Sequence, residues 1–172
     1  MKAIFRTGFI LLACALTSIE IAAAQPANLG CSSENSISAQ TLHCQGGVTI
    51  VAENGARYTL QDRGGKGRVD TVGLSSKALL IEVLKKSGGN KFQVITPQAI
   101  AGVRGTKWAV DVAEKKTSVF VVNGRVAVGR RTGNHGVTLG SGEGVDVEES
   151  GPLTVKRWPP ARVSALLARL GQ

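Results

Sequence analysis

The stretch that decides the fold is FQVITPQAIAGVRGTKWAVDVAEKKTSVFVVNGRVAV, residues 92–128. Apolar residues alternate with polar or small ones over residues 107–112, and this period of two is typical of half-buried β-strands. Residues 91–96 and 117–122 are further runs rich in Val, Ile, Phe and Thr, which strands favour. Turn-forming residues separate the runs, and the last turn, Asn123-Gly124, precedes another short apolar run. The stretch therefore predicts a series of short strands joined by tight turns.

The same pattern of short apolar runs separated by turn residues continues on both sides of this stretch. Residues 48–51 and 57–60 flank the pair Asn54-Gly55, and Asn-Gly between two apolar runs predicts a β-hairpin. The further strand candidates are residues 137–139, 145–148 and 153–155. Strands that recur about every 8–12 residues are typical of all-β domains. We therefore expect an all-β fold, as an antiparallel β-roll, a sandwich or a solenoid-like sheet of short strands.

Two upstream segments have a mixed pattern. Residues 62–68, DRGGKGR, have the glycine content and charge of a mobile loop. Residues 78–84 form an apolar run that fits a short helix by propensity and a buried strand by composition. The turn residues at 87–90 and the strand after them favour a strand for 78–84.

The C-terminal segment, residues 158–172, changes to a helical period. Pro159-Pro160 suits a helix start. The apolar residues on one helical face are Val163, Leu166, Leu167 and Leu170. Arg162 and Arg169 lie off this stripe. We expect a short helix that caps an open end or edge of the sheet; a partner-binding or membrane-surface helix is the alternative.

The N-terminal residues 1–24 have the pattern of a secretory signal peptide. Lys2 and Arg6 precede an apolar run over residues 8–16, and small residues at 22–24 offer a cleavage site before Gln25. The alternative is a lipoprotein signal cut before Cys14. We expect a periplasmic or secreted protein of a Gram-negative-type envelope, soluble and without a membrane span once the signal is removed.

Cleavage at Gln25 leaves Cys31 and Cys44, which have only one possible pairing. An oxidising compartment favours a disulfide between them. Metal binding is the alternative, but Cys31, His43 and Cys44 lack C-x-x-C spacing and a fourth ligand. We expect residues 25–45 to form a loose leader with a disulfide loop, in which His43 is a loop residue.

Composition argues against an enzyme. The chain has 172 residues, 22 glycines, 4% aromatic residues and two histidines. It therefore has few residues of the types that form catalytic or metal-binding sites. Gly140-Ser141-Gly142 lacks the spacing of a nucleophile elbow, and residues 102–107 lack that of a phosphate loop. His135 lies in a predicted loop with no implied partner. We expect no catalytic residues, no metal and no cofactor.

One segment resembles a known family. The pattern Thr96-Pro97, then Val103-Arg104-Gly105-Thr106-x-Trp108, then Gly124, closely resembles the FecR domain, named for the ferric-dicitrate sensor. Residues 137–147, VTLGSGEGVDV, match the closing element of that family. The resemblance implies an all-β domain over residues 46–157 that acts outside the inner membrane through protein contacts and is not an enzyme.

The chain departs from the family pattern in two places. Family regulators carry a cytoplasmic N-terminal segment and an internal membrane span, whereas a cleavable signal is expected here, so direct sigma-factor regulation is not expected. Gly65-Lys66-Gly67-Arg68 replaces the usual Gly-Asp upstream, which leaves the strand register before Leu74 open.

The family motif has a structural interpretation in its own right. Pro97 ends a strand, because it donates no ladder hydrogen bond. Gly105 permits a positive φ, Thr106 can bond a nearby backbone group, and Gly124 suits a type I′ turn. Together with Thr96 and Trp108, these residues are expected to be fold determinants.

Charge supplies the remaining functional hint. Lys and Arg number 21 against 12 Asp and Glu, for a net charge of +9. The candidate contacts to an anionic partner are Arg104, Lys107, Arg125, Arg130 and Arg131. Nucleic acid is the usual partner of such charge, but an exported protein rarely meets it. We expect an envelope protein or an anionic envelope polymer; solubility alone is the alternative.

Two function classes remain. The first is a non-catalytic interaction or scaffold module of the cell envelope, in a signalling or assembly system. The second is a small ligand- or glycan-binding β protein or hydrolase of the periplasm. A deep pocket lined by His135 and carboxylates would favour the second class.

Overall fold

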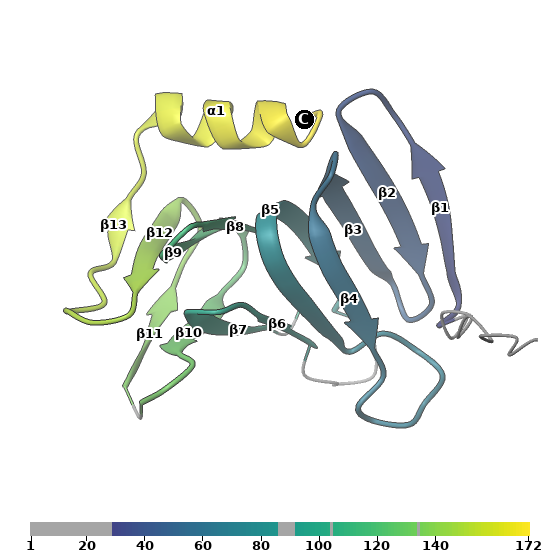
Figure 1. The fold of residues 1–172 in the computed structure, drawn as a ribbon, viewed down its shortest axis with the longest axis horizontal. Helices are drawn as coiled ribbons and strands as arrows, with labels where there is room; N and C mark the ends of the chain where they lie inside the picture. The colour runs from purple at the N-terminus through teal and green to yellow at the C-terminus, as the bar shows by residue number, and fades with distance from the viewer. Residues whose placement is uncertain (1–28, 86–91, 104, 134) are drawn as a thin grey trace, which may run out of the picture.

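The computed structural model describes residues 29–85, 92–103, 105–133 and 135–172. In chain order its elements are β1 (Cys31–Asn35), β2 (Ala39–Cys44), β3 (Val48–Glu53), β4 (Arg57–Gln61), β5 (Thr71–Val83), β6 (Phe92–Ile95), β7 (Ala99–Val103), β8 (Lys107–Ala113), β9 (Lys116–Asn123), β10 (Val126–Arg130), β11 (Gly136–Leu139), β12 (Glu143–Glu148), β13 (Lys156–Arg157) and α1 (Pro160–Arg169). The strands form one curled 13-stranded sheet below a single helix (Figure 1). The expected all-β class with a short C-terminal helix is confirmed.

The long strand β5 divides this sheet into two facing parts. Its first half pairs with β4 and β6, and its second half pairs with β3 and β8. We call the part built from β1, β2, β3, β5, β8, β9, β12 and β13 sheet A, and the part built from β4, β5, β6, β7, β10 and β11 sheet B. β5 passes from one to the other near Lys77, which has a φ of 64°. A positive φ is uncommon outside glycine and changes the direction of the strand there.

The course of β5 also explains why the sheet is mixed rather than wholly antiparallel as expected. β6 pairs in parallel with the first half of β5, with Val72 opposite Val94. A parallel pair normally needs a long crossover connection. Here the second half of β5 serves as part of that crossover, because it crosses sheet A before the chain returns to sheet B.

Both Asn-Gly pairs connect the two sheets, so the hairpin predicted across Asn54-Gly55 is wrong. β3 lies in sheet A and β4 in sheet B, and each pairs with a different half of β5. Gly124 has a φ of 98°, but Asn123 does not share a positive φ, so the turn is not type I′. It leads from β9 in sheet A to β10 in sheet B. The turn residues were predicted from local sequence, whereas pairing partners are set by distant strands.

The inner faces of the two sheets share one hydrophobic core. Sheet A contributes fully buried side chains such as Ile50, Ile81 and Trp108, and sheet B contributes Val72 and Val94. The rings of Phe92 and Trp108 meet edge to face across this core, with centroids 5.8 Å apart. Edge-to-face packing is the geometry that aromatic quadrupoles favour.

The helix α1 covers the outer face of sheet A rather than an end or edge, which corrects the expected capping position. Leu166 and Leu170 pack there with Trp158 against Leu80 and Phe120 of the sheet. The central part of sheet A is thus buried on both sides. This explains the apolar run at residues 78–84, most of which lies in β5: one set of side chains faces the core and the alternate set faces α1. Among the described residues, no helix is long and apolar enough to cross a membrane.

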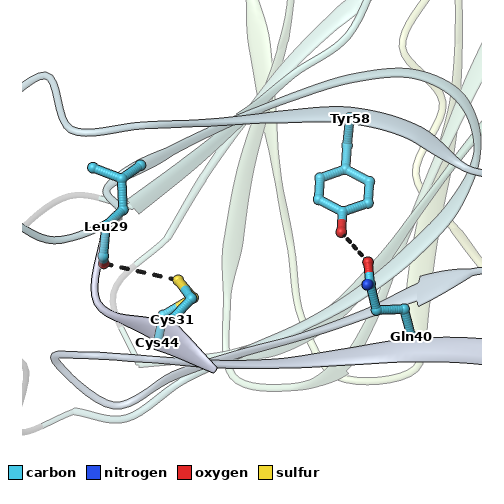
Figure 2. Close-up of a disulfide and its surroundings, with 5 residues drawn as sticks. All are labelled: Leu29, Cys31, Gln40, Cys44 and Tyr58. Atoms are coloured by element: carbon cyan, nitrogen blue, oxygen red, sulfur yellow. Dashed lines mark hydrogen bonds between the residues drawn. A yellow bond between two sulfur atoms is a disulfide. The ribbon is translucent and has the colours of Figure 1, made fainter. Parts of the chain in front are cut away.

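The segment expected to be a loose leader instead supplies two strands of sheet A: β1 at its edge and β2 between β1 and β3. β1 pairs with β2 so that Cys31 lies opposite Cys44, and a disulfide joins the two cysteines (Figure 2). His43 lies in β2 and is not a loop residue. The Gln40 side chain accepts a hydrogen bond from the hydroxyl of Tyr58 on β4, which ties β2 to sheet B. The predicted signal peptide and the turn at residues 87–90 lie outside the described residues.

Two loop expectations also change. The strand expected at residues 153–155 is absent, and the two-residue strand β13 follows instead. The basic loop after β4 is organised by two carboxylates: Asp70 accepts hydrogen bonds from the backbone N–H groups of Arg63 and Gly64 at 3.0 and 2.8 Å, and Asp62 accepts one from Gly67 at 2.5 Å. Backbone N–H groups, chiefly that of Lys66, hold the pKa of Asp62 below its ordinary value.

Candidate interaction surface

The Thr-Pro pair forms the tight β6–β7 turn. Thr96 donates its backbone N–H to the Ala99 carbonyl at 2.9 Å, and Ala99 donates its N–H to Thr96 Oγ1 at 2.8 Å. Thr96 Oγ1 also lies 2.8 Å from Thr117 Oγ1 on β9, and the Thr117 hydroxyl donates to Gln98 Oε1 at 2.8 Å. All of these side chains are buried. A fully bonded buried network of this kind fixes the turn of sheet B against sheet A.

The glycines of the motif meet at the other end of β7. Gly105 and Gly124 have φ values of 63° and 98°, which favour glycine. A β-carbon on Gly124 would lie 2.8 Å from Thr106 Oγ1, and one on Gly105 would overlap Cγ of Lys85. The Thr106 hydroxyl donates to the Arg125 carbonyl at 3.1 Å. With Trp108 in the core, the motif residues thus form turns and packing contacts rather than a chemical site.

Comparison with known protein families identifies a family that matches this chain. The model of the family described as FecR protein matches residues 38–127, from the end of the β1–β2 turn into β10. The chain belongs to the FecR family. The match begins within the segment 25–45 that we expected to precede the domain. No curated relative matches the sequence.

Solved structures with the same fold are also known. Two crystal structures of a candidate anti-sigma factor from Parabacteroides distasonis ATCC 8503 each superpose with a TM-score of 0.61 at 20% identity. The aligned regions cover 80% of this chain and 64% and 63% of those chains, so this chain spans less than two thirds of their length. At this identity the likeness shows the fold alone.

The FecR domain separates the predicted cationic contact residues instead of gathering them. Lys107 and Arg125 lie beside the Gly105 and Gly124 turns, whereas Arg130 pairs with Ala99 near the Thr-Pro turn at the other end. Arg131 follows Arg130 directly, and Arg104 lies outside the described residues. No single patch therefore contains the whole predicted set.

Two of these cations are engaged within the fold. Lys107 Nζ lies 3.5 Å from a glutamate carboxylate of β5. The Arg130 guanidinium donates to three backbone carbonyl oxygens within residues 148–151 at 2.5–3.0 Å. These bonds hold the segment after β12 against β10, so Arg130 has a structural role. Arg125 and Arg131 are exposed and remain available to a partner.

The outer face of sheet B, which we call the open face, differs from the covered face of sheet A. Small residues at alternate positions of neighbouring strands, such as Gly73, Gly102 and Ala127, leave shallow depressions along it. Ile95 and Ile100 are only half buried there. In the described chain the helix lies on the opposite sheet, so these apolar and small groups face solvent.

Cations stand at the rim of the open face. Arg57 and Arg131 line the depression beside the Thr-Pro turn, and Arg125 lines one near the far end. The described residues that line the three depressions include no carboxylate and do not include His135. The surface therefore combines an uncharged floor with positive ends, which suits an elongated partner that carries negative charge.

Sequence reasoning missed Arg57 and the outward glycines of this face. Arg57 begins a strand that we had placed in a hairpin with β3, which gave no reason to set it beside Arg131. The period-two pattern did contain a signal, because small residues at alternate positions of β5, β7 and β10 fall on the same outer face. Only the strand order shows that these faces are contiguous.

The covered face is held by two arginines of α1 that lie off its apolar stripe. Arg162 contacts Asp146 at 2.5 Å and lies 3.5 Å above the Trp158 ring. Burial alone would raise the pKa of Asp146, but hydrogen bonds from Arg162 and Ser118 outweigh it and lower that pKa. Partners so distant in sequence could not be paired from the sequence.

Arg169 forms a second clamp at the other end of the helix. Its guanidinium contacts Asp111 at 2.8 Å and Glu53 at 2.6 Å. Hydrogen bonds, first from Asp111 and then from Glu53, raise the pKa of Arg169. The helix is thus attached by an apolar stripe and by ion pairs on both sides, which leaves sheet B as the sheet with a large accessible face.

Proposed function

We propose that this FecR domain is an exported, non-catalytic interaction module that binds an envelope protein through the open face of sheet B, within a signalling or assembly system. The observation that carries the proposal is the asymmetry between the two outer faces: α1 covers one, and the other presents an uncharged floor with Arg57, Arg125 and Arg131 at its rim. Family membership supports a regulatory role over an enzymatic one. The fold match to a candidate anti-sigma factor is consistent with signalling.

Two features support an exported location. The sequence of residues 1–24 has the pattern of a cleavable signal, and the Cys31–Cys44 disulfide is the kind of crosslink that persists in oxidising compartments. The partner chemistry that fits is an acidic protein segment, because the rim carries arginines and the described residues that line it include no carboxylate. An anionic envelope polymer would present similar charge and is distinguished by the experiment below.

The enzyme alternative has less support from the geometry. It required a deep pocket lined by His135 and carboxylates, whereas the three depressions of the open face are shallow and are lined by other residues. Among the described residues, no three His, Cys, Asp or Glu side chains are grouped closely enough to hold a metal ion. The proposal therefore assigns no residue a catalytic role.

Site-specific photocrosslinking in cells tests the proposed face. A photoreactive residue replaces Ala127, which is exposed on the open face, or Ala168, an exposed alanine of α1 on the other side. We expect a discrete protein adduct from position 127 and none from position 168. Double substitution Arg125→Glu and Arg131→Glu, applied together with the probe at 127, should abolish the adduct without unfolding the domain, because both side chains are exposed.

The outcomes separate the alternatives. Equal adducts from both positions, or an adduct that the arginine substitutions leave unchanged, would show that the open face is not the recognition surface. An adduct that migrates as a polydisperse polymer rather than a discrete protein would assign the face to an envelope glycan. N-terminal sequencing of the same material tests export: mature chains should begin at Gln25, and a lipid-modified Cys14 would contradict the proposed cleavage.

A further inference from the structure

One large apolar side chain is exposed where sheet A ends. Leu84 follows β5 directly and is 56% exposed. Its backbone N–H donates to the Gly47 carbonyl at 2.9 Å. A β-carbon on Gly47 would lie 3.2 Å from the Leu84 side chain, so Leu84 lies across the β2–β3 turn instead of entering the core. Its position is therefore set by the fold, and its exposed apolar surface costs hydration free energy.

Basic side chains lie on either side of this leucine. Arg68 lies across Gly46, with its Cδ 3.4 Å from the position of a β-carbon there, and Lys85 lies against Gly105. Since Leu84 lies across the next glycine of the same turn, Arg68, Leu84 and Lys85 form one row on the surface.

The loop that carries Arg68 adds further charge. Arg63 and Lys66 are exposed in it, and the loop and the β2–β3 turn lie at the same end of the molecule (Figure 1). We call Arg63, Lys66, Arg68, Leu84 and Lys85 together the basic loop end.

Three carboxylates lie in or near this end of the molecule, and each makes contacts within the fold. Asp62 and Asp70 accept backbone hydrogen bonds inside the loop, and Glu82 pairs with Lys107 at 3.5 Å. In the described part of the chain, Arg68 and Lys85 form no ion pair. Backbone hydrogen bonds do not neutralise Asp62 and Asp70, so the four cations of the basic loop end stand against two negative charges in the loop. This end therefore carries a net positive charge next to an exposed leucine.

We propose that the basic loop end docks this protein on an anionic lipid bilayer, with Leu84 inserted among the headgroups and the four cations against lipid phosphates. An exposed apolar side chain beside Lys and Arg side chains is the combination that interfacial membrane contacts require: apolar insertion together with attraction to anionic headgroups. A purely polyanionic ligand would give the leucine no role. This surface is separate from the open face of sheet B, so the domain could contact a bilayer and a protein at the same time.

Vesicle co-sedimentation of the exported chain tests the proposal. Phosphatidylcholine vesicles with and without phosphatidylglycerol are compared for wild type, Leu84→Ser and Lys85→Glu. We expect binding that depends on phosphatidylglycerol. Lys85→Glu should lower this binding by about fivefold or more, as expected for one interfacial charge, and Leu84→Ser should lower it by a similar factor because the inserted apolar side chain is lost. Added salt should weaken wild-type binding, because a Debye length of about 8 Å at physiological salt screens exposed charges.

Each substitution has a matched control at the opposite end of the molecule. Ile37→Ser removes the other large exposed apolar side chain, which is 98% exposed. Lys115→Glu reverses an exposed lysine in the β8–β9 turn. Both controls should bind like wild type, and thermal unfolding should show that all four variants are folded. If Lys85→Glu fails to fold because its stem packs on Gly105, Arg63→Glu makes the same test from an exposed position.

Three outcomes would overturn the proposal: no binding to anionic vesicles, binding that Leu84→Ser leaves unchanged, or equal losses in the matched controls. Unchanged binding of Leu84→Ser would mean nonspecific adsorption of a basic protein. Loss of vesicle binding in Leu84→Ser and Lys85→Glu, with the crosslink at position 127 intact, would show that bilayer docking and protein binding use separate surfaces.

Discussion

Gly144 on β12 lies directly under the tryptophan that anchors α1, and adding one methyl group there should loosen the helix. A β-carbon at Gly144 would overlap the Trp158 indole and lie 2.8 Å from the Val119 carbonyl oxygen. The Trp158 ring stacks on Phe120 with centroids 5.1 Å apart. In Gly144→Ala, the indole must therefore move away from Phe120 and from the guanidinium above it.

The magnitude follows from this geometry. Overpacking a buried site costs about 1–3 kcal/mol, and complete loss of a buried tryptophan costs about 3–5 kcal/mol. Because the new methyl group meets both a ring and a backbone oxygen, we expect the free energy of unfolding to fall by about 2–3 kcal/mol. For a domain of this size, that lowers the melting temperature by about 5–10 °C.

Tryptophan fluorescence and a double-mutant cycle test the mechanism. Trp158 should become more exposed and its emission should shift to longer wavelength, while Trp108 in the core, which is fully buried, serves as the internal reference. In a Trp158→Ala background, Gly144→Ala should cost much less, with only the contact to the Val119 carbonyl left. Equal costs in the two backgrounds would refute the argument that Gly144 acts through Trp158.

Three further changes test other parts of the fold. Gly105→Val places a branched side chain at a φ of 63° and against Lys85, so it should cost more than about 1 kcal/mol; a wild-type melting curve would contradict this. Without reductant, purified protein should have no free thiols, and replacing Cys31 and Cys44 by Ser should cost up to about 3 kcal/mol for a separation of 13 residues; two titratable thiols would disprove the bridge. Because the folded pKa of Asp146 is lowered, its contribution to stability is present above the unfolded value and is lost as pH falls below about 4; Asp146→Asn should flatten this acid limb of stability against pH, and an unaltered limb would count against it.

Local signals located most of the strands and turns correctly. The strands predicted within residues 92–128 match β6, β8, β9 and β10, whereas β7 was not predicted, and turns form at the predicted Pro97 and Gly124. Period and turn chemistry are properties of neighbouring residues, so a short window of sequence contains them. The hairpin across Asn54-Gly55 failed for a related reason: the turn is local, but β3 and β4 find their partners on different halves of β5.

The candidate sites were also predicted only in part from the sequence. Net charge predicted an anionic partner but could not show that Arg130 is used to hold backbone carbonyls while Arg131 faces solvent. Exposure depends on what packs nearby, and a sum of charges contains no such information. The open face depends on even more of the fold, because Gly73, Gly102 and Ala127 become parts of one surface only through the order of the four strands β5, β6, β7 and β10.

By itself, then, the sequence determined the β class, the places of most strands and turns, the apolar stripe of the C-terminal helix and the one cysteine pair available for a crosslink. Each of these depends on residue type and on spacing over a few positions. Only the tertiary structure decided that β5 belongs to both sheets, that α1 covers sheet A and leaves sheet B open, and that Leu84 lies exposed beside Arg68 and Lys85. These features depend on contacts between residues far apart in the chain, whose relative positions are set when the two sheets close over a common core.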